Sequence, residues 1–265
     1  MFIPQSYSLA VILCIITMLC WGSWGNTQKL AGKSWRFELF YWDYVIGILL
    51  FALILGFSLG SVGENGRAFI PDIKQAETGN ILNAVLGGII FNASNILLVA
   101  AMAIAGMAVA FPVGVGIALA LGVILNYIFT PKGNPVILFT GLALIVAAII
   151  IDAIAYKKHS SSQQRVSRKG ILLSVSAGIL MALFYRFVAS SMASDFASPE
   201  QGKLTPYSAV FFFAIGVVIS NFLFNYIIMK KPFEGEPVSF RDYAQGSAGV
   251  HFTGILGGVI SNIGM

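Results

Sequence analysis

Long apolar runs alternate with short polar segments along the whole chain. Each run consists mainly of Ile, Leu, Val, Ala, Phe and Gly, without the alternation of apolar and polar residues that a β-barrel requires. A helix needs about 20 residues to cross about 30 Å of hydrocarbon, and eight runs reach or approach that length. They predict transmembrane helices at residues 9–30, 40–60, 81–102, 107–129, 135–156, 170–193, 206–229 and 249–265.

The composition agrees with a membrane location. Of the 265 residues, 57% are hydrophobic and 10% are charged, whereas soluble chains carry about 25% charged residues. The first run is not predicted to be a removable signal peptide, because residues 1–8 contain no Lys or Arg. Cys14 and Cys20 lie on different faces of one predicted helix and cannot pair. The predicted fold is all-α, a multi-pass transmembrane helical bundle.

Basic residues predict the orientation, because Lys and Arg near span ends are retained on the cytoplasmic side. Eleven of the 16 basic residues fall in one set of alternate loops, and four fall in the opposite set. The N-terminus is therefore predicted outside the cell. The first set is Lys29, Lys33, Arg36, Lys157, Lys158, Arg165, Arg168, Lys169, Lys230, Lys231 and Arg241; the second is Arg67, Lys74, Lys132 and Lys203.

Residues 157–169 contain five basic residues and no acidic one, which predicts a cytoplasmic linker. A site for anionic lipid or nucleic acid is the alternative for such a cluster. The topology signal is sufficient to explain it, so no nucleic-acid partner is expected.

A short motif recurs on either side of this linker. Residues 83–92 read NAVLGGIIFN and residues 253–262 read TGILGGVISN. The motifs lie on the third and eighth predicted spans, and an offset of five spans reverses the membrane direction. The chain is therefore predicted to contain an inverted repeat, the arrangement in which two similar halves rock about a central site.

The repeat defines three predicted parts: a first five-helix unit at 1–156, the basic linker at 157–169 and a second unit at 170–265. Two five-span units would need ten spans, and the sequence ends within the eighth. We therefore expect the second repeat to be truncated.

Polar residues at membrane depth are costly, and they are candidate functional positions. The segment Cys20–Lys29 contains Trp21, Trp24 and Asn26. Indole faces can stack on a sugar or a heterocycle, and amides can pair with hydroxyl or ureido groups. The alternative is an aromatic belt at the membrane interface.

Two charged residues also fall within predicted spans. Asp43 is a candidate for proton coupling, with an acid at headgroup level as the alternative. Arg186 is expected to face inward and bind the solute or a carboxylate, although it could instead extend to the outer surface.

Amides within the predicted spans form the largest group of candidate solute-binding residues. Some of them are expected to make only helix-to-helix hydrogen bonds, and the pair Asn92 and Asn262 is favoured because it recurs in both motifs. Pro112 is a candidate hinge, with a tolerated proline in the first helical turn as the alternative. The candidate amides are Asn92, Asn95, Asn221, Asn225 and Asn262.

Enzymatic motifs are absent from the sequence. It contains no GxxxxGK[ST] phosphate-binding loop, no HExxH and no CxxC. We therefore expect no ATP-driven reaction, no catalytic residues, no metal and no cofactor. The oligomeric state stays open.

Several segments together resemble the drug/metabolite transporter superfamily, and within it the glucose/ribose porters, the rhamnose–proton symporters and the ureide permeases. The similar segments are MLCWGSWGNTQKLAGKSW, ELFYWDY, LGGIIFNASN and GMAVAFPVGVGIALALGVILNYIFTPKGNP. The resemblance implies ten spans in two inverted five-span units and transport of small polar solutes, often with protons.

The predicted function is secondary transport of a monosaccharide or ureide-like solute across the cytoplasmic membrane, coupled to protons, in a chain surrounded by membrane lipid. The first alternative is an exporter of drugs or metabolites in the same fold. The second is a membrane scaffold or sensor that transports nothing.

Overall fold

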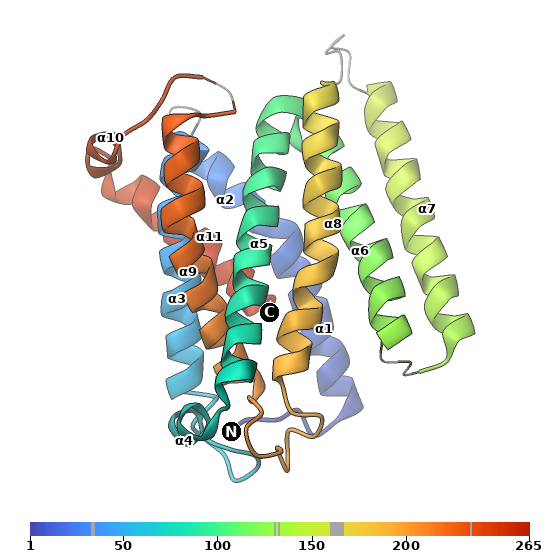
Figure 1. Cartoon of the computed structure of the whole chain (residues 1–265). Helices are drawn as coiled ribbons and strands as arrows, with labels where there is room; N and C mark the ends of the chain where they lie inside the picture. Colours follow the sequence, from blue (N-terminus) through green and yellow to red (C-terminus); the bar gives the residue numbers. More distant parts are fainter. Residues whose placement is uncertain (33–34, 130, 132, 160–166, 234) are drawn as a thin grey trace. The chain divides into compact units, whose positions relative to one another are not determined.

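The computed structural model describes residues 1–32, 35–129, 131, 133–159, 167–233 and 235–265. Lys33, Lys132, Arg165 and most of the predicted linker lie outside the described residues, and the side chains of Asp152, Lys157 and Lys158 are also outside them. The helices run in the order α1 (Tyr7–Ser23), α2 (Gly25–Leu30), α3 (Phe37–Phe57), α4 (Phe69–Gln75), α5 (Thr78–Ala105), α6 (Met107–Phe129), α7 (Pro135–His159), α8 (Arg168–Ser191), α9 (Pro206–Lys230), α10 (Phe240–Ala244) and α11 (Ala248–Ile263) (Figure 1).

Helices occupy all eight predicted spans, and the prediction of a multi-pass helical membrane protein is confirmed. Six stretches of the described chain are long and apolar enough to cross a membrane, with α1 and α2 counted as one stretch. The apolar stretches Pro135–Ile151 and Ala248–Ile263 are shorter. Met18 and Leu19 on α1 are 72% and 66% exposed, which is favourable against lipid and costly in water.

The chain forms two compact units, whose boundaries fall inside α5 and α8. The first unit combines Met1–Ile89 with Phe187–Met265, and the second is Ile90–Arg186. The first unit thus contains helices from both sides of the linker. The predicted division at 156 and 170 follows the sequence repeat and stays a prediction.

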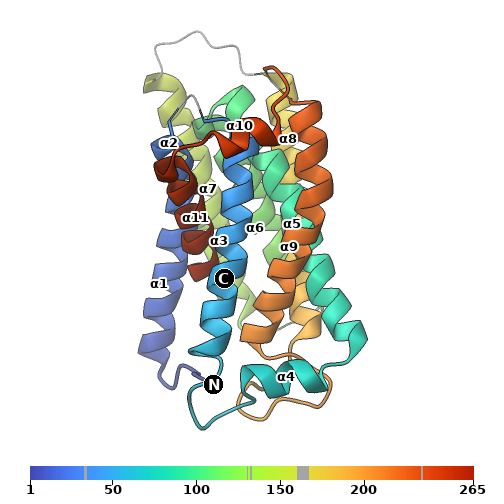
Figure 2. The same ribbon diagram turned by 90° about the vertical axis from the view of Figure 1, so that its left-hand side faces the viewer.

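Helix α3 is the centre of the first unit, where it packs on α9 and on α11 (Figure 2). Tyr41, Tyr44 and Ile48 on α3 are fully buried. Helix α2 also packs on α11, and Trp24 lies against Tyr44 with ring centroids 5.0 Å apart.

Glycines allow two pairs of helices in the first unit to approach backbone to backbone. A Cβ on Gly258 of α11 would overlap the carbonyl oxygen of Tyr44, and one on Gly47 of α3 would overlap that of Ile255. In the same way, α5 and α9 meet at Gly88 and Gly216, where a Cβ would overlap a carbonyl of the opposite helix. Small residues at such crossings are how helices associate in membranes, where apolar burial provides little driving force. Gly88 and Gly258 belong to the two copies of the repeated motif.

In the second unit, α6 packs on α7 and approaches α8 closely. A Cβ on Gly178 of α8 would lie 2.6 Å from the carbonyl oxygen of Gly114 on α6. The Ser94 hydroxyl of α5 donates to the carbonyl of Ala177 over 2.7 Å. Small residues therefore also set the spacing of these helices.

Gly258→Ala tests the glycine crossing of α3 and α11. The added methyl group overlaps the α3 backbone, so we expect a loss of stability of about 1–3 kcal/mol or more, seen as a lower unfolding temperature in detergent. Gly141→Ala is the matched control, because nothing lies within 4 Å of a Cβ at that position. Equal unfolding temperatures for the two variants would contradict the close crossing.

Candidate functional site

A buried carboxylate on α3 is the centre of a polar cluster near one end of the first unit. Asp43 Oδ1 accepts a hydrogen bond from the Tyr243 hydroxyl over 2.6 Å. His251 Nδ1 lies 2.9 Å from Asp43 Oδ2 and 3.1 Å from Oδ1. Three elements that are distant in sequence, α3, α10 and α11, therefore meet at one carboxylate.

Local sequence features place these side chains. Gly254 of α11 lets that helix approach α3, because a Cβ there would overlap the Cβ of Asp43. Tyr243 lies on α10, which begins with a capping box in which Ser239 and Asp242 bond each other's backbone N–H. The ring centroids of Trp35 and His251 are 5.3 Å apart, edge to face.

Burial raises the pKa of Tyr243, and the hydrogen bond to Asp43 and its charge raise it further. A raised pKa favours the neutral phenol, so Tyr243 stays a hydrogen-bond donor throughout the neutral pH range. An ionised carboxylate can only accept. With Asp43 ionised, His251 Nδ1 must therefore carry a proton and donate it in the hydrogen bond.

A second ion pair lies at the N-terminal end of α3. Arg36 pairs with the buried Glu38, with Nη2 2.5 Å from Oε1 and Nε 3.1 Å from Oε2. Arg36 also donates to the carbonyl of Glu236. These contacts hold the segment before α3 and the segment after α9 at the same end of the first unit, the end that carries α10 in Figure 2.

Three predicted amides in the first unit are buried. Asn225 Nδ2 of α9 donates to the Glu38 carbonyl over 2.8 Å, and Asn262 Nδ2 of α11 donates to the Ile48 carbonyl over 2.6 Å. Their Oδ1 atoms have no hydrogen-bond partner among the described residues. Neither Oδ1 nor Nδ2 of Asn221, which is fully buried on α9, has a partner in the described part of the chain.

The predicted aromatic residues pack on α11 and α3. Trp21 is 37% exposed, and its indole N–H donates to the Ser261 carbonyl over 3.2 Å. Trp24 is buried against Tyr44, as described above, whereas Asn26 is exposed. The two indoles therefore contact α11 and α3 directly, and their role toward a solute stays a prediction.

The remaining candidates lie in the second unit. Asn92 and Asn95 are buried on α5, and Pro112 lies inside α6. Arg186 is exposed, with its guanidinium carbon 3.3 Å from the centroid of the Phe129 ring. No ion pair joins Arg186 to a carboxylate among the described residues. Its guanidinium therefore contacts an aromatic ring rather than an acidic side chain. The solute-binding and hinge roles of these residues stay predictions.

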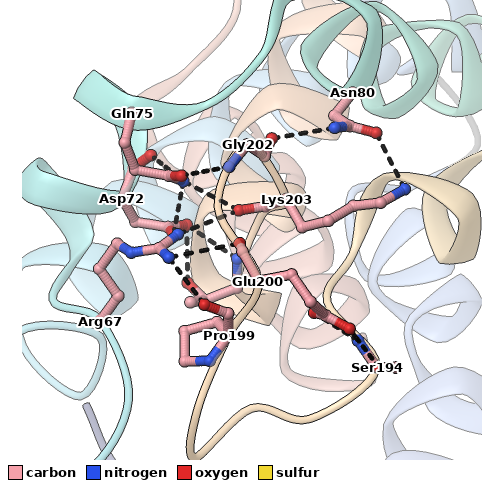
Figure 3. Close-up of polar contacts among 10 residues, drawn as sticks. Arg67, Asp72, Gln75, Asn80, Ser194, Pro199, Glu200, Gly202 and Lys203 are labelled. Atoms are coloured by element: carbon pink, nitrogen blue, oxygen red, sulfur yellow. Dashed lines mark hydrogen bonds and ion pairs between the residues drawn. The ribbon is translucent and has the colours of Figure 1, made fainter.

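A larger polar network closes the opposite end of the first unit (Figure 3). Asp72 on α4 is fully buried, and its Oδ1 lies 2.9 Å from Arg67 NH1. Its Oδ2 accepts from the Thr205 backbone N–H and hydroxyl, over 2.8 and 3.0 Å. Gln75 donates to the Lys203 carbonyl over 2.9 Å. The segment between α3 and α5 is thereby attached to the segment between α8 and α9.

Further bonds extend the network toward the helix ends. Lys203 Nζ donates to the Ser190 carbonyl over 2.6 Å and to Asn80 Oδ1 over 3.1 Å. The Ser194 hydroxyl donates to Glu200, and this bond is the main cause that lowers the pKa of the Glu200 carboxyl. Every polar side chain drawn in Figure 3 has a partner, so this network is a structural connection.

Sequence reasoning identified Asp43 but missed its partners. His251 and Tyr243 follow it by 208 and 200 positions, and nothing in local spacing links them. The predicted topology offered one signal. It places the α9–α11 connection, near whose end Tyr243 and His251 lie, on the same side of the membrane as the start of α3. Among the described residues, no group of three or more His, Cys, Asp or Glu could hold a metal ion.

Comparisons with known proteins point to one family. The family model for ureide permeases matches residues 40–169, a segment that contains Asp43, Asn92, Asn95 and Pro112. The chain is similar to the ureide permeases. Ureide permease 4 of Arabidopsis thaliana is 22% identical over 302 aligned positions, which cover 89% of this chain and 75% of that protein.

Two further relatives agree. Ureide permease 3 of the same plant is 23% identical and covers 92% of this chain, with 79% of its own length aligned. Ureide permease 1 is 25% identical over 62% of this chain and 43% of its own length. The ureide permease part of the predicted resemblance is confirmed, whereas the wider superfamily and the sugar-transporting branches stay predictions.

Tyr243→Phe tests the hydroxyl that donates to Asp43. We expect a loss of about 1.5–3 kcal/mol, typical of a hydrogen bond to a charged group, measured as a lower unfolding temperature in detergent. A loss should be present at both pH 6 and pH 9, because the raised pKa of Tyr243 keeps the phenol a neutral donor at both. Tyr226→Phe, at an exposed tyrosine of α9, should change little. A loss confined to one pH would contradict the assignment of Tyr243 as a constant donor.

Asp72→Ala tests the network at the opposite end. Removing one member of a buried ion pair leaves the other uncompensated, at a cost of about 3 kcal/mol or more. Asp195→Ala is the control, because this exposed carboxylate accepts from the Ala197 N–H alone among the residues that the structure describes. If both variants unfold at the same temperature, the network does not hold the two segments together.

Proposed function

We propose that the chain is a secondary transporter that carries a small neutral ureide-like solute across the cell membrane by proton symport and alternating access. The relatives are named ureide permeases, and this name supports a transporter rather than an enzyme. It also supports ureides over monosaccharides as the class of solute.

The fully buried amide of Asn221 is the observation that carries the proposal. A buried amide without hydrogen bonds costs about 1–3 kcal/mol, so its retention inside an apolar helix needs an explanation. Binding a solute recovers that cost, because the solute supplies the missing partners.

A ureido group matches what these amides offer. It has N–H donors beside a carbonyl acceptor, and a primary amide can donate to the carbonyl and accept from an adjacent N–H at the same time. Asn221 has both atoms free of partners among the described residues, and Asn225, four residues later on α9, adds an acceptor oxygen. A solute rich in N–H donors fits these unpaired amide atoms better than a solute that mainly accepts hydrogen bonds.

Asp43 is the proposed proton-coupling group. It is the acidic side chain that α3 buries beyond Glu38, and Glu38 is already engaged by Arg36. A carboxylate held by an imidazole and a phenol can bind and release a proton as its surroundings change.

The two glycine crossings support alternating access by an inverted repeat. Gly47 and Gly216 are 169 positions apart, and Gly88 and Gly258 are 170 apart. Helices α3 and α5 are the second and third predicted spans, and α9 and α11 are the seventh and eighth. If the second span corresponds to the seventh and the third to the eighth, the α3–α11 crossing in one repeat direction is equivalent to the α9–α5 crossing in the other. This is the relationship expected of two halves related by inverted topology.

The contact between Arg36 and Glu236 supports the orientation with the N-terminus outside. It brings the basic segment that includes Lys29 and Arg36 to the same end of the first unit as Lys230 and Lys231. One end is therefore enriched in basic residues, as the cytoplasmic side should be.

Asn221→Ala tests the solute site. In vesicles with the reconstituted protein, we expect uptake of labelled hydantoin or methylurea to fall at least about tenfold, the equivalent of about 1.4 kcal/mol of lost binding. Asn65→Ala changes an exposed loop asparagine and should transport normally. Equal uptake by both variants would remove Asn221 from the site, and uptake of glucose but of neither ureide would contradict the solute class.

Asp43→Asn tests proton coupling. We expect exchange of labelled solute between the two sides to continue, while accumulation driven by a pH gradient is lost, because an amide cannot carry the proton. Glu64→Gln removes an exposed carboxylate and should accumulate solute like the unchanged protein. Accumulation by Asp43→Asn at the normal level would exclude Asp43 as the coupling group.

A further inference from the structure

His251 connects the protein surface to the buried carboxylate. The His251 side chain is 24% exposed and that of Asp43 is 3% exposed. The imidazole is therefore partly exposed where it contacts the buried carboxylate, which places the ring on a route between the protein surface and Asp43.

The two ring nitrogens have different surroundings. Nδ1 is within hydrogen-bond distance of both Asp43 oxygens, as given above, and Nε2 is on the other side of the ring, where Gly246 passes. A Cβ at position 246 would lie 2.6 Å from Nε2, so only a glycine leaves this edge of the ring clear of a side chain. Nε2 makes no hydrogen bond to another described side chain.

Aromatic residues hold the ring in this orientation. The Tyr243 and His251 centroids are 4.7 Å apart at an interplanar angle of 74°. The Trp35 ring contacts both, with its centroid 5.3 Å from that of His251 and 6.4 Å from that of Tyr243. Among the described residues, the titratable side chains in contact with the imidazole are Asp43 from α3 and Tyr243 from α10. The raised pKa of Tyr243 makes it a fixed donor, so it does not exchange protons in the neutral range.

We propose that His251 is a proton-carrying residue of the transport cycle, which transfers protons between water at the α10 end of the first unit and Asp43. Water-borne acid protonates Nε2, the resulting imidazolium releases its Nδ1 proton to Asp43 Oδ2, and a neutral ring with the proton on Nε2 remains. Release follows the same steps in reverse: the Asp43 carboxyl returns its proton to Nδ1 as Nε2 gives one to water, which empties Asp43 and restores the initial state. Imidazole suits this task because one nitrogen can accept a proton while the other releases one.

The proposal rests on the proposed coupling role of Asp43. Its test separates the proton-carrying role of His251 from the proposed transport function. Infrared difference spectra of the purified protein after a rapid pH drop follow the protonated carboxyl band that Asp43→Asn deletes. In His251→Asn, the amide nitrogen can occupy the place of Nδ1 and keep the hydrogen bond to Asp43, but it cannot carry a proton. We expect the band to appear at least about tenfold more slowly in this variant.

A chemical rescue separates proton transfer from support of the structure. In His251→Ala, added imidazole should restore the rate of the Asp43 band, whereas pyrazole, a ring of the same size and far lower basicity, should not. Equal rescue by both rings, or an unchanged rate in His251→Asn, would overturn the role of His251. If the band is slowed as expected but no labelled ureide or sugar enters vesicles, the relay stands and the proposed transport function fails.

Discussion

Direct backbone contact between helices is the constraint on which the rest of the first unit depends. Gly47 and Gly258 bring α3 and α11 to a separation that any side chain would prevent. At that separation the amide of Asn262 reaches the backbone of α3, and His251 reaches Asp43. In lipid, where apolar burial contributes little to association, such close packing and the hydrogen bonds it permits supply much of the attraction.

The polar groups of the first unit differ in how completely they are satisfied. At the end that carries α4, the carboxylate of Asp72 and the guanidinium of Arg67 use several partners each. Inside the spans, the amide of Asn221 has none among the described residues. Full satisfaction makes a rigid connection, whereas an unpaired buried amide is available to a ligand. A transporter needs both properties, at different depths.

Hydrophobic patterning predicted the helices well, because a span is a local property of about 20 consecutive residues. The two copies of the repeated motif contain Gly88 and Gly258, which lie at the two helix crossings in the structure. The partners of Asp43 could not be predicted, since His251 and Tyr243 are brought to it by long-range packing. The hydrogen bond from the Trp21 indole N–H to a backbone carbonyl could not be predicted either, because it depends on how α1 meets α11.

Solute-driven proton movement tests the account most directly. Vesicles that contain the purified protein and an internal pH indicator, with equal pH on both sides, would receive hydantoin or methylurea outside. Proton symport predicts that the interior becomes acidic as the solute enters and that Asp43→Asn abolishes the pH change. Entry of the ureide with no change of internal pH in the unchanged protein would contradict proton-coupled transport.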